Sequence, residues 1–187
     1  MAQTAESEIN ADTPMAEILA LFPGAKRALF ARYHIGGCQS CSYSDDETLS
    51  EVCERNENLP VSEVIEHIYS ANEADQKILM EPIDLKTAIE SNEPIRLIDL
   101  RTREEFDSVK LPDAEIFSNQ LLQQIFGTED KERLIVLYDH RGDRCLDAAA
   151  YLLGHGFKNT KALRGGIDAY AEEADSKLPR YRVEFED

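Results

Sequence analysis

The second half of the sequence alternates short apolar runs with stretches of helical periodicity. The apolar runs are IRLIDL, AEIF, LIVLY and TKAL, at residues 95–100, 114–117, 134–138 and 160–163. Such runs, bounded by turn residues and separated by helical patterns, are typical of buried β-strands. Strands spaced by helices predict a mostly parallel sheet with helices on both faces. The sequence therefore predicts an α/β domain over residues 79–187.

The first half carries helical periodicity and no strand signal. Four helices are predicted, opening at Thr13-Pro14, at residue 25, at a Ser44-x-x-Glu47 capping box and at residue 61. The segment before the first helix is polar, and a second polar run follows the fourth helix. We therefore expect a disordered arm at 1–12, a small all-α domain at 13–70 and a linker at 71–78.

The net charge of the chain argues against some classes of binding partner. It has 37 acidic and 20 basic side chains, a net charge of −17. Residues 1–80 hold 14 acidic and 5 basic residues (−9), which leaves 23 and 15 (−8) for 81–187. Both halves are acidic, so we expect no nucleic-acid partner and no membrane surface. The N-terminal MAQTAESEIN lacks a signal-peptide pattern, and four cysteines are too few for a secreted disulfide framework, which favours a cytoplasmic protein.

The octet YDHRGDRC, residues 138–145, follows the most apolar of the predicted strands and precedes a helical pattern. A strand–loop–helix turn directs backbone N–H groups and a helix N-terminus towards whatever lies in the loop. Such a loop suits an anion or a reactive thiolate. However, the residue directly after the strand is Asp139, and the only thiol of the loop is Cys145 at its far end.

Three motifs around this loop resemble the rhodanese family, over about residues 81–175. LIDLRTREEFDSVKLPDAEI resembles the entry motif of the family, and GFKNTKALRGGIDAY its closing motif. Between them, YDHRGDRC lies where rhodaneses have Cys-x-x-Gly-x-Arg-Ser/Thr. The resemblance implies a parallel five-stranded sheet flanked by helices, in agreement with the pattern of apolar runs.

The resemblance does not extend to the nucleophile of the family, whose sulfurtransferases carry a persulfide on the first residue of the loop. Gly142 and Arg144 match the family, but the nucleophile position is Asp139. A carboxylate cannot carry a transferable sulfur atom. We therefore expect no rhodanese-type sulfurtransferase activity. We also expect an ionised Asp139, held by the loop N–H groups and the Arg144 side chain.

A displaced nucleophile is the alternative for this site. Cys145 occupies the Ser/Thr position of the motif, where a helix N-terminus and a neighbouring arginine would lower a thiol pKa. It competes with a simpler interpretation, in which Cys145 is a small residue packed against the sheet. His155, in a helix-terminating GHG, is a weaker candidate. The active-site-like loop comprises Asp139, His140, Arg141, Gly142, Asp143 and Arg144.

The thiol pair Cys38-x-x-Cys41 is the strongest reactive element of the first half. It follows Gly36-Gly37, and two thiols at this spacing can form a disulfide, pass on a persulfide or ligate a metal. The surrounding residues, about 13–70, resemble the small helical domain described as the hybrid-cluster-protein-associated redox disulfide domain. We expect no cofactor. A metal or iron–sulfur cluster on the pair is the alternative, with Cys53 and His34 as further ligands.

These observations leave three hypotheses open. In the first, Cys38 and Cys41 perform thiol redox or sulfur-relay chemistry with a protein partner, and the rhodanese-like domain acts in binding or sensing. In the second, the protein is an active sulfurtransferase that uses Cys145. In the third, both domains only bind other proteins. The sequence carries no signal for an oligomeric state.

Overall fold

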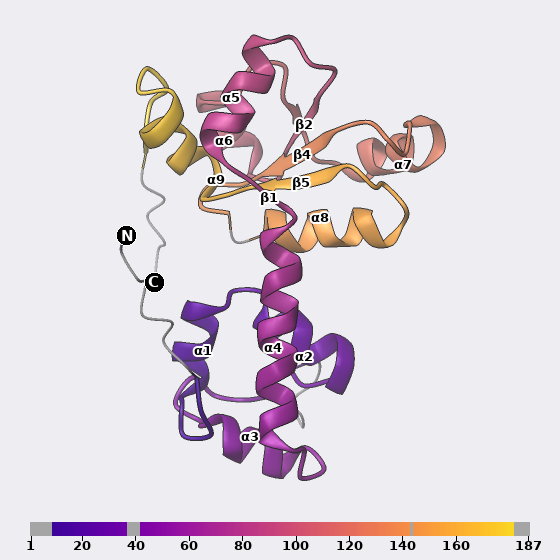
Figure 1. The fold of residues 1–187 in the computed structure, drawn as a ribbon. Coiled ribbons are helices and arrows are strands. Elements are labelled where there is room, and N and C mark those ends of the chain that lie inside the picture. The colour runs from indigo at the N-terminus through magenta and orange to yellow at the C-terminus, as the bar shows by residue number, and fades with distance from the viewer. Residues whose placement is uncertain (1–8, 37–41, 143, 182–187) are drawn as a thin grey trace. The chain divides into compact units, whose positions relative to one another are not determined.

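The computed structural model describes residues 9–36, 42–142 and 144–181, and it divides the chain into two compact units, 1–76 and 77–187. Figure 1 shows helices alone in the first unit and a sheet with helices in the second. Over the described residues, no helix is long and apolar enough to span a bilayer. Each unit is built around its own buried cluster.

The first unit is a small helical domain. Its helices are α1 (Met15–Leu21), α2 (Ala25–Tyr33), α3 (Leu49–Arg55) and α4 (Val61–Gln76). Each helix turns an apolar face inwards, and Leu29, Leu49 and Ile68 are fully buried in the shared core. This burial supplies most of the stability of helices as short as α1 and α3, which are too short to persist alone.

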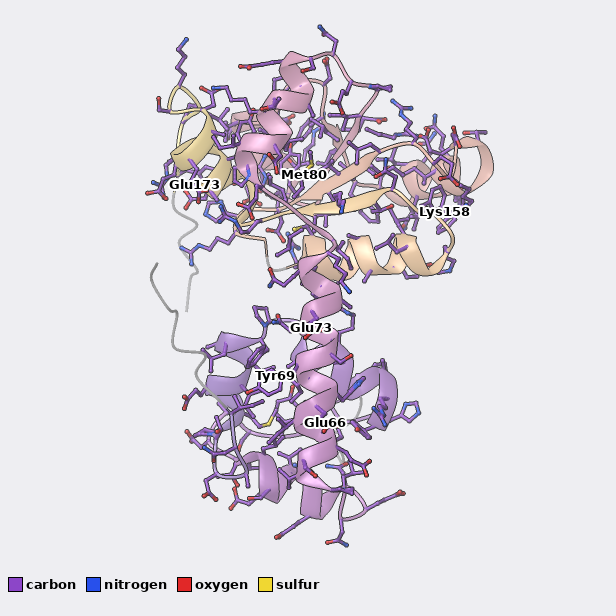
Figure 2. All side chains as sticks on the ribbon, viewed as in Figure 1. Glu66, Tyr69, Glu73, Met80, Lys158 and Glu173 are labelled. Carbon is purple, nitrogen blue, oxygen red and sulfur yellow. The ribbon has the colours of Figure 1, made fainter. Side chains whose placement is uncertain are left out.

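The structure corrects three predictions in this unit. Residues 9–12 are not a disordered arm, because Ile9 is buried in the core and its N–H donates to the hydroxyl of Tyr69. Figure 2 shows Tyr69 on α4. The predicted linker is wrong for residues 71–76, which continue α4. The capping box of α3 is formed by Thr48 and Glu51 rather than by Ser44 and Glu47.

The start of α1 also differs by one residue. The predicted N-cap, Thr13, uses its hydroxyl to accept the N–H of Asn10 at 2.8 Å, and Pro14 is the residue in the N-cap position. The side chain of Thr13 thus closes the turn before the helix. A sequence pattern does not distinguish these two uses of a threonine hydroxyl.

The second unit has the predicted α/β architecture. Its sheet has five parallel strands in the order β1-β5-β4-β2-β3, with β4 in the centre. The strands are β1 (Leu79–Met80), β2 (Arg96–Asp99), β3 (Glu115–Ile116), β4 (Ile135–Tyr138) and β5 (Thr160–Leu163). The four strands predicted from apolar runs are confirmed. The fifth, β1, has only two residues and was implied by the resemblance alone.

Helices cover both faces of this sheet (Figure 1). They are α5 (Pro82–Glu90), α6 (Arg103–Ser108), α7 (Asn119–Thr128), α8 (Cys145–Gly154) and α9 (Gly166–Ala169), which continues as the π-helical turn η1 (Tyr170–Ala174). Alternate residues of β4 point to opposite faces. Ile135 and Leu137 join the cluster that includes α7 and α8, whereas Val136 and Tyr138 join the cluster that includes α5 and α9.

Candidate functional site: the loop after the central strand

The loop at residues 139–144 lies at the carboxyl end of β4, between this strand and α8. In a parallel sheet this end of the central strands is the usual position of a functional site. The apolar sequence of β4 buries all four of its residues, so the chain emerges at a fixed point. The loop is therefore held at both ends by regular structure.

The carboxylate of Asp139 is buried under the loop and accepts four backbone N–H groups. The N–H groups of Arg141 (3.0 Å) and Gly142 donate to Oδ1, and those of Arg144 (2.6 Å) and Cys145 (3.1 Å) donate to Oδ2. Asp139 is only 3% exposed. Hydrogen bonds from N–H groups to a carboxylate are shorter and stronger than those to a neutral acceptor. The loop thus surrounds an anionic group supplied by its own first residue.

Arg144 contributes to this arrangement differently from the prediction. Its backbone N–H binds Asp139, but its guanidinium Nη2 donates to the carbonyl oxygen of Leu100 at 2.9 Å. The arginine therefore ties the loop to the end of β2. The expected ion pair between the Arg144 side chain and Asp139 is replaced by this contact.

The start of α9 is hydrogen-bonded to the other side of the loop. The carbonyls of Asp139 and His140 accept the N–H groups of Ile167 (2.9 Å) and Asp168 (3.1 Å) at the start of α9. This approach requires Gly166, at φ +61°, because a Cβ there would lie 2.5 Å from the Asp139 carbonyl oxygen. Contact with the loop thus explains the second glycine of the Gly-Gly step in the closing motif.

The side chain of Cys145 packs in the core and not in the loop. Its side chain is fully buried in the cluster beneath α8, and its thiol donates to the carbonyl of Leu163 at 3.7 Å. A persulfide-forming thiol must meet a donor molecule, and this thiol has no solvent-exposed surface. The geometry favours the packing interpretation of Cys145. His155 caps the end of α8, where its ring nitrogen Nδ1 lies 2.8 Å from the carbonyl oxygen of Tyr151.

The structure adds residues that the sequence did not single out as a site. Arg101 is fully buried and pairs with Asp99 through Nε (2.9 Å) and Nη2 (2.6 Å). Burial by itself would lower the pKa of Arg101, but the hydrogen bonds and charge of Asp99 raise it above its usual value. Nη1 of Arg101 donates to the hydroxyl of Tyr181 at 2.6 Å. The sequence signal that could have identified Asp99 and Arg101 was the Asp-x-Arg within the entry motif.

Tyr181 brings the C-terminal segment to this network. Its hydroxyl donates to Glu105 at 2.8 Å, and its ring centroid lies 4.7 Å from that of His140 in the loop. Burial and the hydrogen bond to Glu105 raise the pKa of Tyr181 to about 12. Nδ1 of His140 is buried and has no hydrogen-bond partner within the described part of the chain. Tyr181 is 80 residues from Arg101, so no local pattern could reveal this contact.

Of the remaining predicted site residues, some lie outside the described part of the chain and the others lie in the helical unit. Cys38, Cys41 and Asp143 are outside the described residues. Cys53 is 1% exposed in the helical core, where burial raises its thiol pKa, and His34 ends α2 in a left-handed conformation. Across residues 9–36, 42–142 and 144–181, no cluster of three or more His, Cys, Asp or Glu side chains is arranged to hold a metal.

Comparisons with known proteins agree with this fold. Residues 81–173 match the model of the rhodanese-like domain. A tRNA uridine(34) hydroxylase of Hamiltonella defensa is 38% identical over 109 residues, which cover 51% of this chain and 30% of the relative. An adenylyltransferase and sulfurtransferase of Candida albicans is 29% identical over 115 residues, which cover 57% and 26%.

The chain thus spans less than a third of the length of either relative. Among solved structures, a rhodanese-like domain protein of Staphylococcus aureus is similar, with a TM-score of 0.43 and 21% identity over 56% of this chain and 98% of that chain. The family match covers four of the five strands, β2 to β5, together with the loop after β4 and the Gly-Gly step. Residues 81–173 of this chain are a rhodanese-like domain.

Proposed function

We propose that the protein performs thiol redox or sulfur-relay chemistry in the cytoplasm through Cys38 and Cys41. In this proposal the rhodanese-like domain binds or senses a protein partner and has no sulfurtransferase activity of its own. The relative named as a sulfurtransferase supports a sulfur-related function for the domain. The assignment of the chemistry to the Cys-x-x-Cys pair rests on the spacing of the two thiols.

One observation supports the proposed lack of sulfurtransferase activity: the carboxylate of Asp139 accepts four N–H groups of its own loop. In a sulfurtransferase these donors would stabilise a thiolate or persulfide at the same position. Here the donors are already satisfied by a side chain that cannot bond to sulfur. The negative charge of Asp139 also repels an anionic donor such as thiosulfate.

The chemistry proposed for the pair is a balanced exchange. When Cys38 and Cys41 form a disulfide, they lose two electrons and two protons, which reduce a partner disulfide to two thiols. In the relay form, a donor persulfide transfers its outer sulfur to one thiolate of the pair and leaves as a thiol. The second cysteine then displaces that sulfur as hydrosulfide, and the pair becomes a disulfide.

A thiosulfate:cyanide assay tests the rhodanese-like site. We expect no turnover above background in the wild type and measurable turnover in Asp139→Cys, because a thiol at that position would face the four N–H donors. Asp139→Ser is the matched control, since it removes the charge without adding a thiol that could carry sulfur. Wild-type turnover that is lost in Cys145→Ser would contradict the proposal and establish Cys145 as the nucleophile.

Mass spectrometry of the full chain tests the Cys-x-x-Cys pair separately. After equilibration with a disulfide oxidant, the wild type should lose two mass units, and Cys41→Ser should not show this loss. Cys53→Ser is the matched control, because that thiol is buried in the helical core and should leave the loss unchanged. Two unreacted thiols at positions 38 and 41 would refute the redox role.

A further inference from the structure

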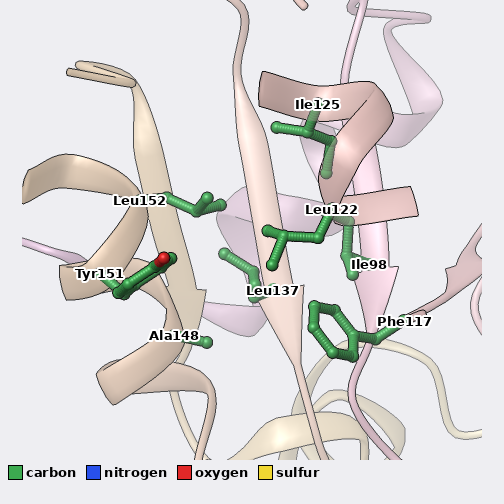
Figure 3. Close-up of a pocket in the computed structure, with 8 residues that line it drawn as sticks. All are labelled: Ile98, Phe117, Leu122, Ile125, Leu137, Ala148, Tyr151 and Leu152. Atoms are coloured by element: carbon green, nitrogen blue, oxygen red, sulfur yellow. The ribbon is translucent and has the colours of Figure 1, made fainter. Parts of the chain in front are cut away.

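An apolar cavity lies on the face of the sheet that α7 and α8 cover (Figure 3). Its volume is about 190 Å³. The floor is formed by Ile98 of β2, Leu137 of β4, Ile125 of α7 and Leu152 of α8, each no more than 2% exposed. Four separate elements of the domain core thus fix the position and shape of the floor.

The small side chain of Ala148 leaves space in the wall formed by α8. Ala148, Tyr151 and Leu152 all line the cavity, as residues three and four apart on one helix face do. The two larger residues reach further over the sheet, whereas the methyl group of Ala148 does not. Figure 3 shows Leu122 on the opposite wall, from α7.

Two aromatic rings form the exposed rim of the cavity. Phe117, just after β3, is 41% exposed, and Tyr151 is 52% exposed. The ring of Tyr151 is held by neighbours, with its centroid 4.3 Å from that of His155 and 6.2 Å from that of Phe126. Large apolar rings held at a surface opening provide edge and face contacts for another ring.

The chemistry of the lining defines what the cavity accepts. Within the described part of the chain, no charged side chain lines the cavity, and the Tyr151 hydroxyl is the only polar side-chain group among its lining residues. A charged ligand would lose its hydration there without gaining a partner, which strongly opposes its entry. An apolar protein cavity of about 150 Å³ is large enough for benzene. The volume and the lining therefore suit one small, neutral ring.

We infer that this cavity is a binding site for a neutral, one-ring aromatic group. Binding would bury the ring against Leu137 and Leu152 and place its outer edge between Phe117 and Tyr151. The site is distinct from the loop after β4 and does not rest on the proposed thiol chemistry, because none of its lining residues belongs to the loop at 139–144.

Titration of the full-length protein with toluene, followed by amide chemical shifts, tests this inference. We expect saturable shifts in α7 and α8, and none of comparable size with benzoate, which has the same ring and a negative charge. Ala148→Leu should weaken toluene binding by at least about tenfold, because the added carbons occupy the cavity. Ala150→Leu, the same change two residues along α8, should leave binding unchanged, because residue 150 does not line the cavity.

A second variant tests the cavity without filling it. Leu122→Ala should enlarge the cavity by removing side-chain atoms from its wall. Naphthalene, a two-ring probe, should then bind the variant more tightly than it binds the wild type. Three results would each overturn the inference. They are the absence of saturable toluene shifts in the wild type, unchanged toluene affinity in a folded Ala148→Leu, and equal binding of benzoate and toluene.

Discussion

The loop after β4 and the cavity between α7 and α8 are two regions of one domain that differ in what occupies them. The loop presents four N–H donors, and the protein fills it with the Asp139 carboxylate. The cavity presents apolar side chains, and about 190 Å³ between them is not filled by the protein. Unpaired buried N–H groups cost more than imperfect apolar contact and require partners in fixed directions.

This difference predicts how the two regions respond to substitution. The geometry of the loop is determined from three sides at once, by Asp139 below it, by Arg144 bound to the carbonyl of Leu100, and by the start of α9. The cavity wall is determined by packing alone, which tolerates a change of volume more easily than a lost hydrogen bond. Changes in the loop should therefore destabilise the fold, and a well-chosen change in the cavity should stabilise it.

The largest expected effect is that of Asp139→Ala, which leaves four loop N–H groups without their acceptor. We expect the free energy of unfolding to fall by about 3 kcal/mol, with water entering the loop and limiting the loss. Urea unfolding measures this change. Asp139→Asn keeps one acceptor oxygen and should lie between the wild type and the alanine variant. A loss below about 0.5 kcal/mol for Asp139→Ala would mean that the loop does not depend on its carboxylate.

Gly166→Ala should have the next largest effect, a loss of about 2 kcal/mol. The added Cβ would lie 2.5 Å from the carbonyl oxygen of Asp139, at a φ of +61° that alanine adopts poorly. Gly154→Ala, at the end of α8, is the matched control because a Cβ there meets nothing within 4 Å. Thermal unfolding of the two variants side by side should show a clear decrease in Tm only for Gly166→Ala.

The smallest expected effect has the opposite sign. Ala148→Leu adds apolar atoms where the cavity has space, and we expect the free energy of unfolding to rise by about 1 kcal/mol. The measurement is again urea unfolding, with Ala150→Leu as the control on the same helix. Destabilisation by Ala148→Leu alone would show that the cavity wall is as rigid as the loop, and the contrast between the two regions would be lost.

Much of the fold could be predicted from local patterns. The apolar runs at 95–100, 134–138 and 160–163 became β2, β4 and β5, because runs of four mostly buried residues have a strong extended signal. The run at 114–117 became β3, which has only two residues, neither of them buried. Thr102 and Glu105, at the capping-box spacing, do form a capping box at the start of α6. The two residues of β1 were too few to show a period. The predicted Ser44 capping box was wrong because Thr48 and Glu51 repeat the same spacing four residues later.

Some features of the candidate site could likewise be recognised from the sequence, and others could not. Asp139 at the end of β4 and the glycines before α9 were recognisable, because each depends on its position along the chain. The hydrogen bond of the Arg144 side chain to Leu100 and the contact of Tyr181 with Arg101 were not, since their partners are 44 and 80 residues away. The burial of Ile9 against Tyr69 was missed for the same reason, across 60 residues.

By itself, the sequence determined the order of β2 to β5 along the chain, the loop that follows β4 and the carboxylate at its first position. These features depend on backbone propensity, on the period of apolar residues and on motif spacing, all of which act over a few residues. Only the tertiary structure decided which groups Asp139 binds, where Arg144 points, that Cys145 is buried and that a cavity remains under α7 and α8. Those outcomes depend on side chains from distant segments competing for the same space and the same hydrogen-bond partners, and that competition exists only once the chain has folded.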